Sequence, residues 1–209
     1  MNRQSTIASP VSIPRFLVFW VGANFLGGFV VGLLENNGLQ FMATLVLTGA
    51  IVGTAQWLVL KSQGGFRWWP LASALGWIVS TLGVIALSGV YQSVAVLLWQ
   101  AFGLWEVFWL NLVREPLVVM GMALAQGWIL QQHGRFPTGQ VVPTPWSWLL
   151  VSLLGGALQG AGSAALCALL CQSLPSLLVG LVNGLGWAAY GLTTGIWLIR
   201  QQAGIEESL

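Results

Sequence analysis

Charged residues are scarce in this chain. Its 209 residues include 7 lysines or arginines and 5 aspartates or glutamates, which is 6% of the sequence. A soluble domain carries roughly 25% charged residues, so a chain this poor in charge cannot cover a water-facing surface. Apolar residues make up 56% of the chain, and the lipid bilayer is therefore its predicted solvent. The formal net charge of +2 is too small to indicate a nucleic-acid partner.

Residues that carry out catalysis are also scarce. His133 is the only histidine, and no carboxylate or cysteine stands near it in sequence, which argues against a histidine-based zinc or serine-protease site. Glycine-rich nucleotide loops are absent. The five carboxylates are expected at helix ends or in tails, so that no span holds a proton relay: Glu35, Glu106, Glu115, Glu206 and Glu207. The sequence therefore predicts a non-enzymatic protein with no cofactor and no metal.

Cysteine is nearly absent as well. Cys167 and Cys171 stand one helical turn apart in an apolar segment. Two cysteines at that spacing in one helix usually serve as small apolar packing residues, so a disulfide or metal pair is not expected here.

What the chain has is long apolar runs. Six segments reach the length of about 20 residues that a helix needs to cross the hydrocarbon layer. They are apolar throughout rather than alternating, which favours helices over a β-barrel. The turn signal Asn36-Asn37-Gly38 joins the first two as an antiparallel hairpin. We expect one all-α integral membrane domain over 1–209, with six transmembrane helices as three hairpins (about 14–60, 68–132 and 146–199); the segments are 14–35, 40–60, 68–90, 116–132, 146–171 and 175–199.

The stretch 91–113 is hydrophobic enough to be a seventh span. It contains Gln100, Glu106 and Asn111, and a glutamate at the membrane centre is costly. Its aromatic residues recur at helical spacing and suit the headgroup region: Trp99, Phe102, Trp105, Phe108 and Trp109. We therefore interpret 91–113 as an interfacial helix.

The distribution of basic residues predicts the orientation. With six spans, both termini and the loops at 61–67 and 133–145 share one side, and only Arg114 lies on the other. That side holds Arg3, Arg15, Lys61, Arg67, Arg135 and Arg200. The positive-inside rule then places both termini in the cytoplasm. The N-terminus does not resemble a cleaved signal.

Tryptophan recurs at a regular spacing. Trp57, Trp128 and Trp197 follow one another about every 70 residues, each near the end of an apolar run and before a polar patch. We expect them to be anchors at the cytoplasmic interface. A second pattern places an aromatic, a small polar residue and a glycine on one helix face, beginning at Trp20, Trp69 and Trp148. Whether the hairpin is truly triplicated stays open, since 27 glycines and 13 tryptophans generate matches by chance.

Glycine pairs four residues apart are typical of closely packed membrane helices. The predicted helix-packing glycines are Gly28, Gly32, Gly49, Gly53, Gly156, Gly160, Gly191 and Gly195. Neutral polar residues inside the spans are expected to hydrogen-bond between helices; the alternative is that they line a pocket for a neutral ligand. These residues are Asn24, Gln56, Gln126, Gln159 and Asn183. A pigment is a further alternative, but no predicted span holds the histidine that usually ligates one.

One region carries a sequence likeness. It runs Gly53-Thr-Ala-Gln56-Trp57-Leu-Val-Leu-Lys61 and continues with Trp68-Trp69-Pro-Leu-Ala-Ser73-Ala-Leu-Gly76-Trp77. This region resembles uncharacterised Trp-rich multi-spanning membrane proteins of cyanobacteria and Chloroflexi-type bacteria. The resemblance implies a bacterial plasma or thylakoid membrane, and no known activity. In layout only, the chain is similar to the S component of energy-coupling-factor vitamin transporters.

Together these features predict a membrane protein that works by packing. The first hypothesis is an accessory or assembly subunit of a larger membrane complex, such as a photosynthetic one, with the bilayer and other membrane subunits as its partners. The alternative is a carrier or capture protein for a small neutral or aromatic molecule. The two hypotheses differ in what should co-purify with the chain from its native membrane. An accessory subunit should bring another protein, and a carrier should bring a small molecule.

Overall fold

Every regular element of the described chain is a helix. The computed structural model describes residues 13–61, 66–132 and 144–203. Five helical segments in these ranges are long and apolar enough, by length and composition, to cross a membrane: Pro14–Leu60, Trp69–Ala86, Glu106–Gln132, Pro145–Ser173 and Ser176–Gln201. The predicted class, all-helical with membrane-length apolar helices, is confirmed.

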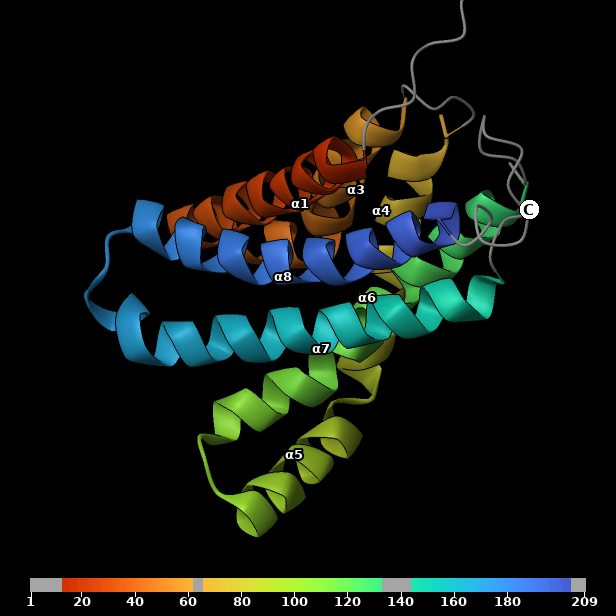
Figure 1. The fold of residues 1–209 in the computed structure, drawn as a ribbon. Helices are drawn as coiled ribbons and strands as arrows, with labels where there is room; N and C mark the ends of the chain where they lie inside the picture. Colours follow the sequence, from red (N-terminus) through yellow and green to blue (C-terminus); the bar gives the residue numbers. More distant parts are fainter. Residues whose placement is uncertain (1–12, 62–65, 133–143, 204–209) are drawn as a thin grey trace, which may run out of the picture.

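Six helices form a closed ring (Figure 1). They are α1 (Ile13–Leu34), α3 (Thr48–Leu60), α4 (Trp69–Ala86), α6 (Glu106–Gln132), α7 (Pro145–Leu170) and α8 (Ser176–Ala203). Each packs against the helices that flank it in this order, and α8 closes the ring against α1. Three interfaces of the ring lie within a predicted hairpin: α1–α3, α4–α6 and α7–α8. The other three join neighbouring hairpins: α3–α4, α6–α7 and α8–α1.

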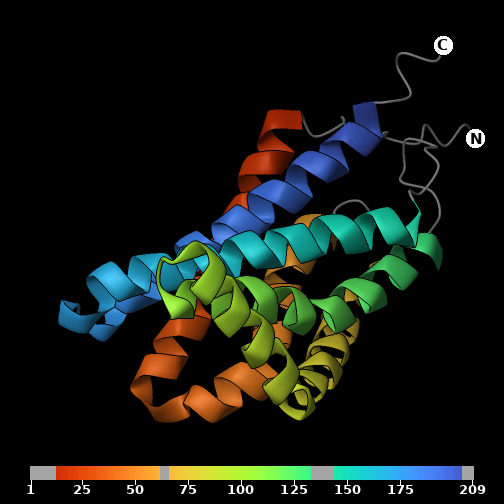
Figure 2. The same ribbon diagram turned by 90° about the horizontal axis from the view of Figure 1, so that it is seen from below.

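The longest apolar segment, Pro14–Leu60, folds back on itself. Asn37 (φ −115°, ψ 31°) and Gly38 (φ 87°, ψ 2°) leave the helical conformation, and glycine accepts this left-handed backbone without strain. The chain then passes through short turns to reach α3: η1 (Glu35–Leu39), α2 (Gln40–Met42) and η2 (Ala43–Leu47). This reversal and the connection between α7 and α8 lie at the end of the ring away from the chain termini (Figure 2).

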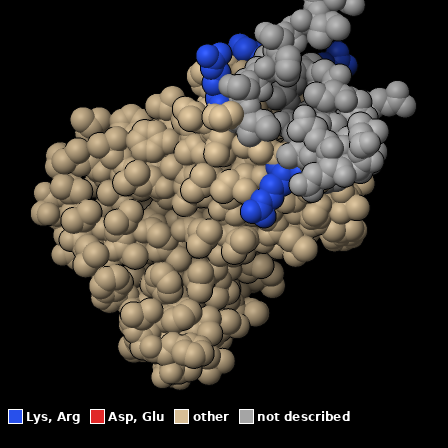
Figure 3. All heavy atoms as spheres, viewed as in Figure 1, with Lys and Arg blue, Asp and Glu red and all other residues tan. Residues whose placement is uncertain are grey.

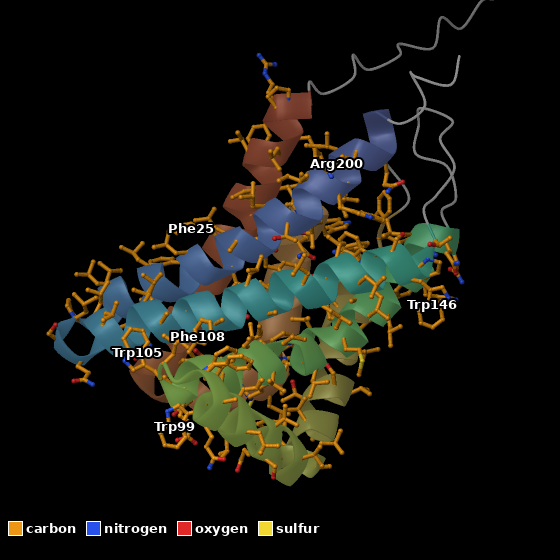
Figure 4. The ribbon with its side chains drawn as sticks, turned by 60° about the horizontal axis from the view of Figure 1, so that its bottom comes forward. Phe25, Trp99, Trp105, Phe108, Trp146 and Arg200 are labelled. Atoms are coloured by element: carbon orange, nitrogen blue, oxygen red, sulfur yellow. A yellow bond between two sulfur atoms is a disulfide. The ribbon has the colours of Figure 1, made fainter. Side chains whose placement is uncertain are left out.

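The range 91–113 does not form the single helix that its sequence pattern predicts. Helix α5 (Ser88–Phe102) ends there, and α6 begins at Glu106 after a reversal. Gly103 (φ 70°) and Leu104 (φ 66°) both have left-handed backbone, which terminates α5. Helix α5 packs against α6 and, with the turn that joins them, stands out from the ring as the α5–α6 arm; Trp99 lies on α5 and Trp105 in the turn (Figure 4).

Helix α6 is longer than predicted, because it begins at Glu106, almost three turns before the expected start at Pro116. The helix continues through Pro116, so Arg114 and Glu115 lie inside it rather than at its end. Glu115 is only 7% exposed. Helix α7 makes room for it with Gly160, where a Cβ would lie 2.6 Å from the Glu115 Cβ. The prediction that Glu115 falls at a helix end is therefore wrong.

Small residues set the helix spacing throughout the ring. All eight of the glycines singled out from the sequence lie against a neighbouring helix of a different hairpin. A Cβ on Gly191, for example, would lie 2.9 Å from the Asn24 Cβ. A second glycine set, Gly27, Gly76 and Gly155, faces the other helix of its own hairpin. Helices α1 and α7 therefore carry two glycine faces each, whereas α4 carries one, at Gly76, and meets the glycines of α3 on its other side.

Candidate functional site: a polar core and a polar cavity

The centre of the ring holds a hydrogen-bonded polar network. Gln56 is its hub: its Nε2 donates to Asn24 Oδ1 (2.9 Å), and its Oε1 accepts from Trp69 Nε1 (3.0 Å) and Gln126 Nε2 (2.9 Å). Gln126 Nε2 also donates to Ser73 Oγ (2.8 Å). All five side chains are 0% exposed. The network joins α1, α3, α4 and α6, so three of the predicted interhelix residues, Asn24, Gln56 and Gln126, meet at one depth.

Three buried tryptophans occupy corresponding positions around the ring. These inner tryptophans, Trp20, Trp69 and Trp148, are each 0% exposed and lie in the first helices of the three hairpins. Trp69 donates to Gln56 on the last helix of the preceding hairpin, and Trp20 donates to Thr194 on α8 (3.0 Å). Trp148 occupies the third such position, but among the described residues its buried Nε1 has no hydrogen-bond partner.

Neighbouring positions repeat in step with the inner tryptophans. Four residues after each comes Asn24, Ser73 or Ser152, and seven residues after comes Gly27, Gly76 or Gly155. Gly27 packs against Val52, Gly76 against Met122 and Gly155 against Tyr190. These three partners stand four residues before Gln56, Gln126 and Thr194, respectively. At three equivalent crossings between hairpins a glycine faces a larger side chain: Gly28 with Trp187, Gly49 with Trp77, and Gly156 with Val119. These glycine contacts therefore recur at corresponding positions in the three helix pairs of the described ring.

The regularly spaced tryptophans do not occupy equivalent positions in this register. Trp57 and Trp197 are partly buried against the core cluster that surrounds the inner tryptophans, whereas Trp128 is 60% exposed. The Lys61 ammonium lies 5.6 Å from the centre of the Trp57 ring. All three tryptophans lie near the last turns of α3, α6 and α8, and their role as interface anchors stays a prediction.

A polar cavity lies in the half of the ring away from the termini. Its volume is about 640 Å³, and residues of α1, α4, α6, α7 and α8 line it. Asn36 and Gln40 are exposed at its rim, whereas Thr48, Val118 and Gly160 are buried in its wall. The cavity is therefore open at the end of the ring that holds the turn after α1.

Three of the described charged residues line this cavity: Glu35, Arg114 and Glu115. Arg114 Nη1 forms an ion pair with Glu115 Oε1. Glu35 Oε1 accepts a hydrogen bond from Thr44 Oγ1 (2.9 Å). The charges inside this apolar bundle thus form one cluster.

The remaining predicted polar residues, Gln159 and Asn183, belong to the cavity and not to the network. Gln159 is 6% exposed. Among the described residues, neither Gln159 Oε1 nor Ser163 Oγ has a hydrogen-bond partner, although both atoms are buried. Buried acceptors without partners are costly, so they mark a place where a ligand or water can bind.

The cysteines line the cavity wall as a disulfide between Cys167 and Cys171, which corrects the expectation of two packing residues. Helix α7 ends at Leu170, and the chain tightens into the 3-10 turn η4 (Cys171–Ser173). The Cα–Cα distance is 4.5 Å, inside the range of disulfides, whereas regular helix spacing would separate the two Cα atoms further.

The sequence pattern missed the charged residues of this cavity. Arg114-Glu115-Pro116 has the composition of a helix start, and Glu35 precedes a turn, so the sequence predicts both carboxylates at helix ends. One signal was present: a buried carboxylate needs space, and Gly160 supplies it on α7. His133 and Arg135 lie outside the described residues. No family model, curated protein or solved structure matches the chain.

Proposed function

We propose that this chain is a membrane protein that captures a small polar molecule in the cavity between α1, α6, α7 and α8. One observation carries the proposal, the convergence of Glu35, Arg114 and Glu115 on a cavity of about 640 Å³. Charged groups inside a membrane bundle are expensive and typically mark ligand or ion sites. Gln159 also lines the cavity, and its Oε1 is a buried acceptor in the wall without a hydrogen-bond partner among the described residues. The function is binding without chemistry.

The placement in the membrane belongs to this proposal. The six ring helices cross the bilayer as three hairpins, with both termini in the cytoplasm. In Figure 3 the lysine and arginine side chains gather at the end from which the termini extend, as the positive-inside rule expects. The Cys167–Cys171 disulfide lies at the opposite end, beside the turn between α7 and α8. Disulfides persist in oxidising compartments, which supports an outward-facing cavity.

The α5–α6 arm fits the outer interface in this arrangement. Trp99 is 41% and Trp105 47% exposed, and Trp109 Nε1 donates to the Gly103 carbonyl (2.6 Å). Exposed indoles favour the headgroup region.

A matched pair of variants on α7 tests capture. Ala164→Trp places an indole in the cavity wall, whereas Ala165→Trp alters the next residue, which does not line the cavity. The protein is purified in nanodiscs from its native membrane and examined by native mass spectrometry. We expect a small-molecule adduct on the wild type and on Ala165→Trp, and its loss from Ala164→Trp. An adduct on all three, or on none after incubation with a membrane-free cell extract, contradicts the proposal.

A second candidate is the accessory subunit, which an open groove between α1 and α3 favours. The groove has a volume of about 1040 Å³ and an almost wholly apolar lining that includes Gly22, Ala23, Leu26, Ala50 and Ile51. Small residues at its floor allow close approach of another membrane helix. A partner subunit would bind along this groove.

A matched pair of glycine variants tests whether a partner subunit binds in this groove. No neighbouring atom lies within 4 Å of a Cβ built at Gly22 or at Gly162, so both accept a side chain without disturbing the fold. Only Gly22 lines the groove. After gentle extraction, a partner protein is expected to co-purify with the wild type and with Gly162→Trp, and not with Gly22→Trp. A monodisperse wild-type monomer without any partner removes this candidate.

A further inference from the structure

The charges in the cavity do not balance. Two carboxylates, Glu35 and Glu115, meet one guanidinium, Arg114, and no other charged group lines the cavity among the described residues. Arg114 is committed to Glu115 through their ion pair. In the part of the chain that the structure describes, the hydrogen-bond donor to Glu35 is the Thr44 hydroxyl. With all three ionised, one negative charge is left over, which favours a cation in a low-dielectric site.

The buried acceptor atoms without partners in the cavity wall also favour a positively charged ligand. Gln159 Oε1 is a buried acceptor without a donor, and it lies on α7 beside Gly160, which packs on Glu115. An amide oxygen and two carboxylates are all acceptors. A ligand that brings several N–H donors can satisfy them together, as an ammonium group does with three.

Aromatic rings line the cavity beside these acceptors. Trp77 and Trp187 both reach it, with their ring centres 5.9 Å apart and their planes inclined by 44°. Trp77 Nε1 donates to the Thr44 carbonyl (2.7 Å), which fixes that indole next to the Glu35 partner. Indole faces attract cations and pack against apolar groups, so they suit a ligand with a positive head and an apolar body.

We propose that the captured molecule is a small organic amine in its ammonium form. The ammonium donates to Glu35, Glu115 and Gln159 Oε1, and the apolar part of the amine packs against Trp77 and Trp187. This inference rests on the proposed capture function and narrows it to one ligand class.

Three probes that share one ring test the charge preference: tyramine, the neutral alcohol tyrosol, and 3-(4-hydroxyphenyl)propionate. Binding to the full chain in nanodiscs is measured by isothermal titration. We expect tyramine to bind at least tenfold more tightly than either other probe. Glu115→Gln is expected to weaken tyramine at least tenfold, while Glu106→Gln, on the same helix but outside the cavity, changes nothing. Because Glu115→Gln breaks an ion pair, Glu35→Gln provides a second variant, whose amide oxygen can still accept from Thr44.

The outcomes separate the two proposals. Binding of tyrosol or the propionate as tight as tyramine, and lost in Ala164→Trp, overturns the amine class and leaves capture standing. Tyramine binding that neither Glu35→Gln nor Glu115→Gln weakens also overturns the amine site. Failure of all three probes to bind, together with a wild type that retains no small molecule from its native membrane, overturns both. Preferential tyramine binding that requires either glutamate supports both.

Discussion

The Trp69 indole donates its N–H to Gln56 Oε1 at 3.0 Å, and this bond joins the first hairpin to the second. An equivalent bond from Trp20 to Thr194 joins the first hairpin to the third. Buried tryptophan N–H groups need acceptors, and for Trp69 and Trp20 the acceptor comes from the preceding hairpin in the ring. The polar core therefore links the first hairpin to both of its neighbours, while glycines set how closely the helices pack.

Replacing the hub of the network should destabilise the ring. Gln56→Ala leaves Trp69 Nε1 and Asn24 Oδ1 without their Gln56 partner and removes one acceptor from Gln126. At about 0.6 kcal/mol for each interhelix bond in a membrane, three bonds predict a loss of about 2 kcal/mol in the free energy of unfolding. Unfolding in mixed micelles with increasing SDS measures this loss. The control is Gln100→Ala on exposed α5, which should leave the midpoint unchanged; an equal effect of both variants contradicts a central role for the network.

Two glycines on α4 should differ sharply when replaced by alanine. A Cβ at Gly76 would lie 2.6 Å from the backbone carbonyl carbon of Gly121 and 2.8 Å from the Met122 Cα, and backbone cannot move aside as a side chain can. We expect Gly76→Ala to lower stability by about 1–3 kcal/mol through overpacking of α4 against α6. Gly83→Ala, two turns later on the same helix with open space around it, should be neutral or stabilising by up to about 1 kcal/mol. The same SDS titration checks both, and a stable Gly76→Ala variant would show that the α4–α6 crossing is looser than described.

The helices themselves follow directly from the sequence, because apolar runs bounded by proline and turn residues are local signals. The reversal at Asn37 and Gly38 lies where Asn36-Asn37-Gly38 predicts it. The start of α6 was placed too late, since Arg114, Glu115 and Pro116 look like a helix start unless the space left by Gly160 is known. The pair with positive φ at Gly103 and Leu104 has one signal in the sequence, the glycine, and an isolated glycine in an apolar stretch does not by itself predict a reversal.

The site was less accessible from sequence than the helices. Asn24, Gln56 and Gln126 were recognised as polar residues inside apolar segments, but their common depth depends on the register between helices, which no local pattern encodes. Their separation from Gln159 and Asn183 has the same origin. The spacing of Trp57, Trp128 and Trp197 is regular in the chain, yet the residues that are equivalent in space are Trp20, Trp69 and Trp148, whose spacing is uneven because α5 lengthens the second hairpin.

The orientation can be tested with single cysteines in a Cys167→Ser/Cys171→Ser background. Asn37 and Lys61 are both exposed, at opposite ends of the first hairpin. In intact cells or spheroplasts, Asn37→Cys should react with an impermeant maleimide, and Lys61→Cys only after the membrane is opened. The reverse labelling pattern would invert the proposed topology and turn the cavity toward the cytoplasm.

The disulfide provides an independent test of which side of the membrane the cavity faces. If Cys167 and Cys171 face an oxidising compartment, iodoacetamide should alkylate neither in protein extracted without reductant, and both after reduction, which the intact mass reports. Because the bond closes only a short loop, the Cys167→Ser/Cys171→Ser variant should lose no more than about 2 kcal/mol of stability and keep its fold. Full alkylation without reduction would place the pair in a reducing compartment, and would leave the outward cavity supported by the charge distribution alone. Normal ligand retention by the double serine variant would further show that the disulfide shapes the cavity wall without taking part in binding.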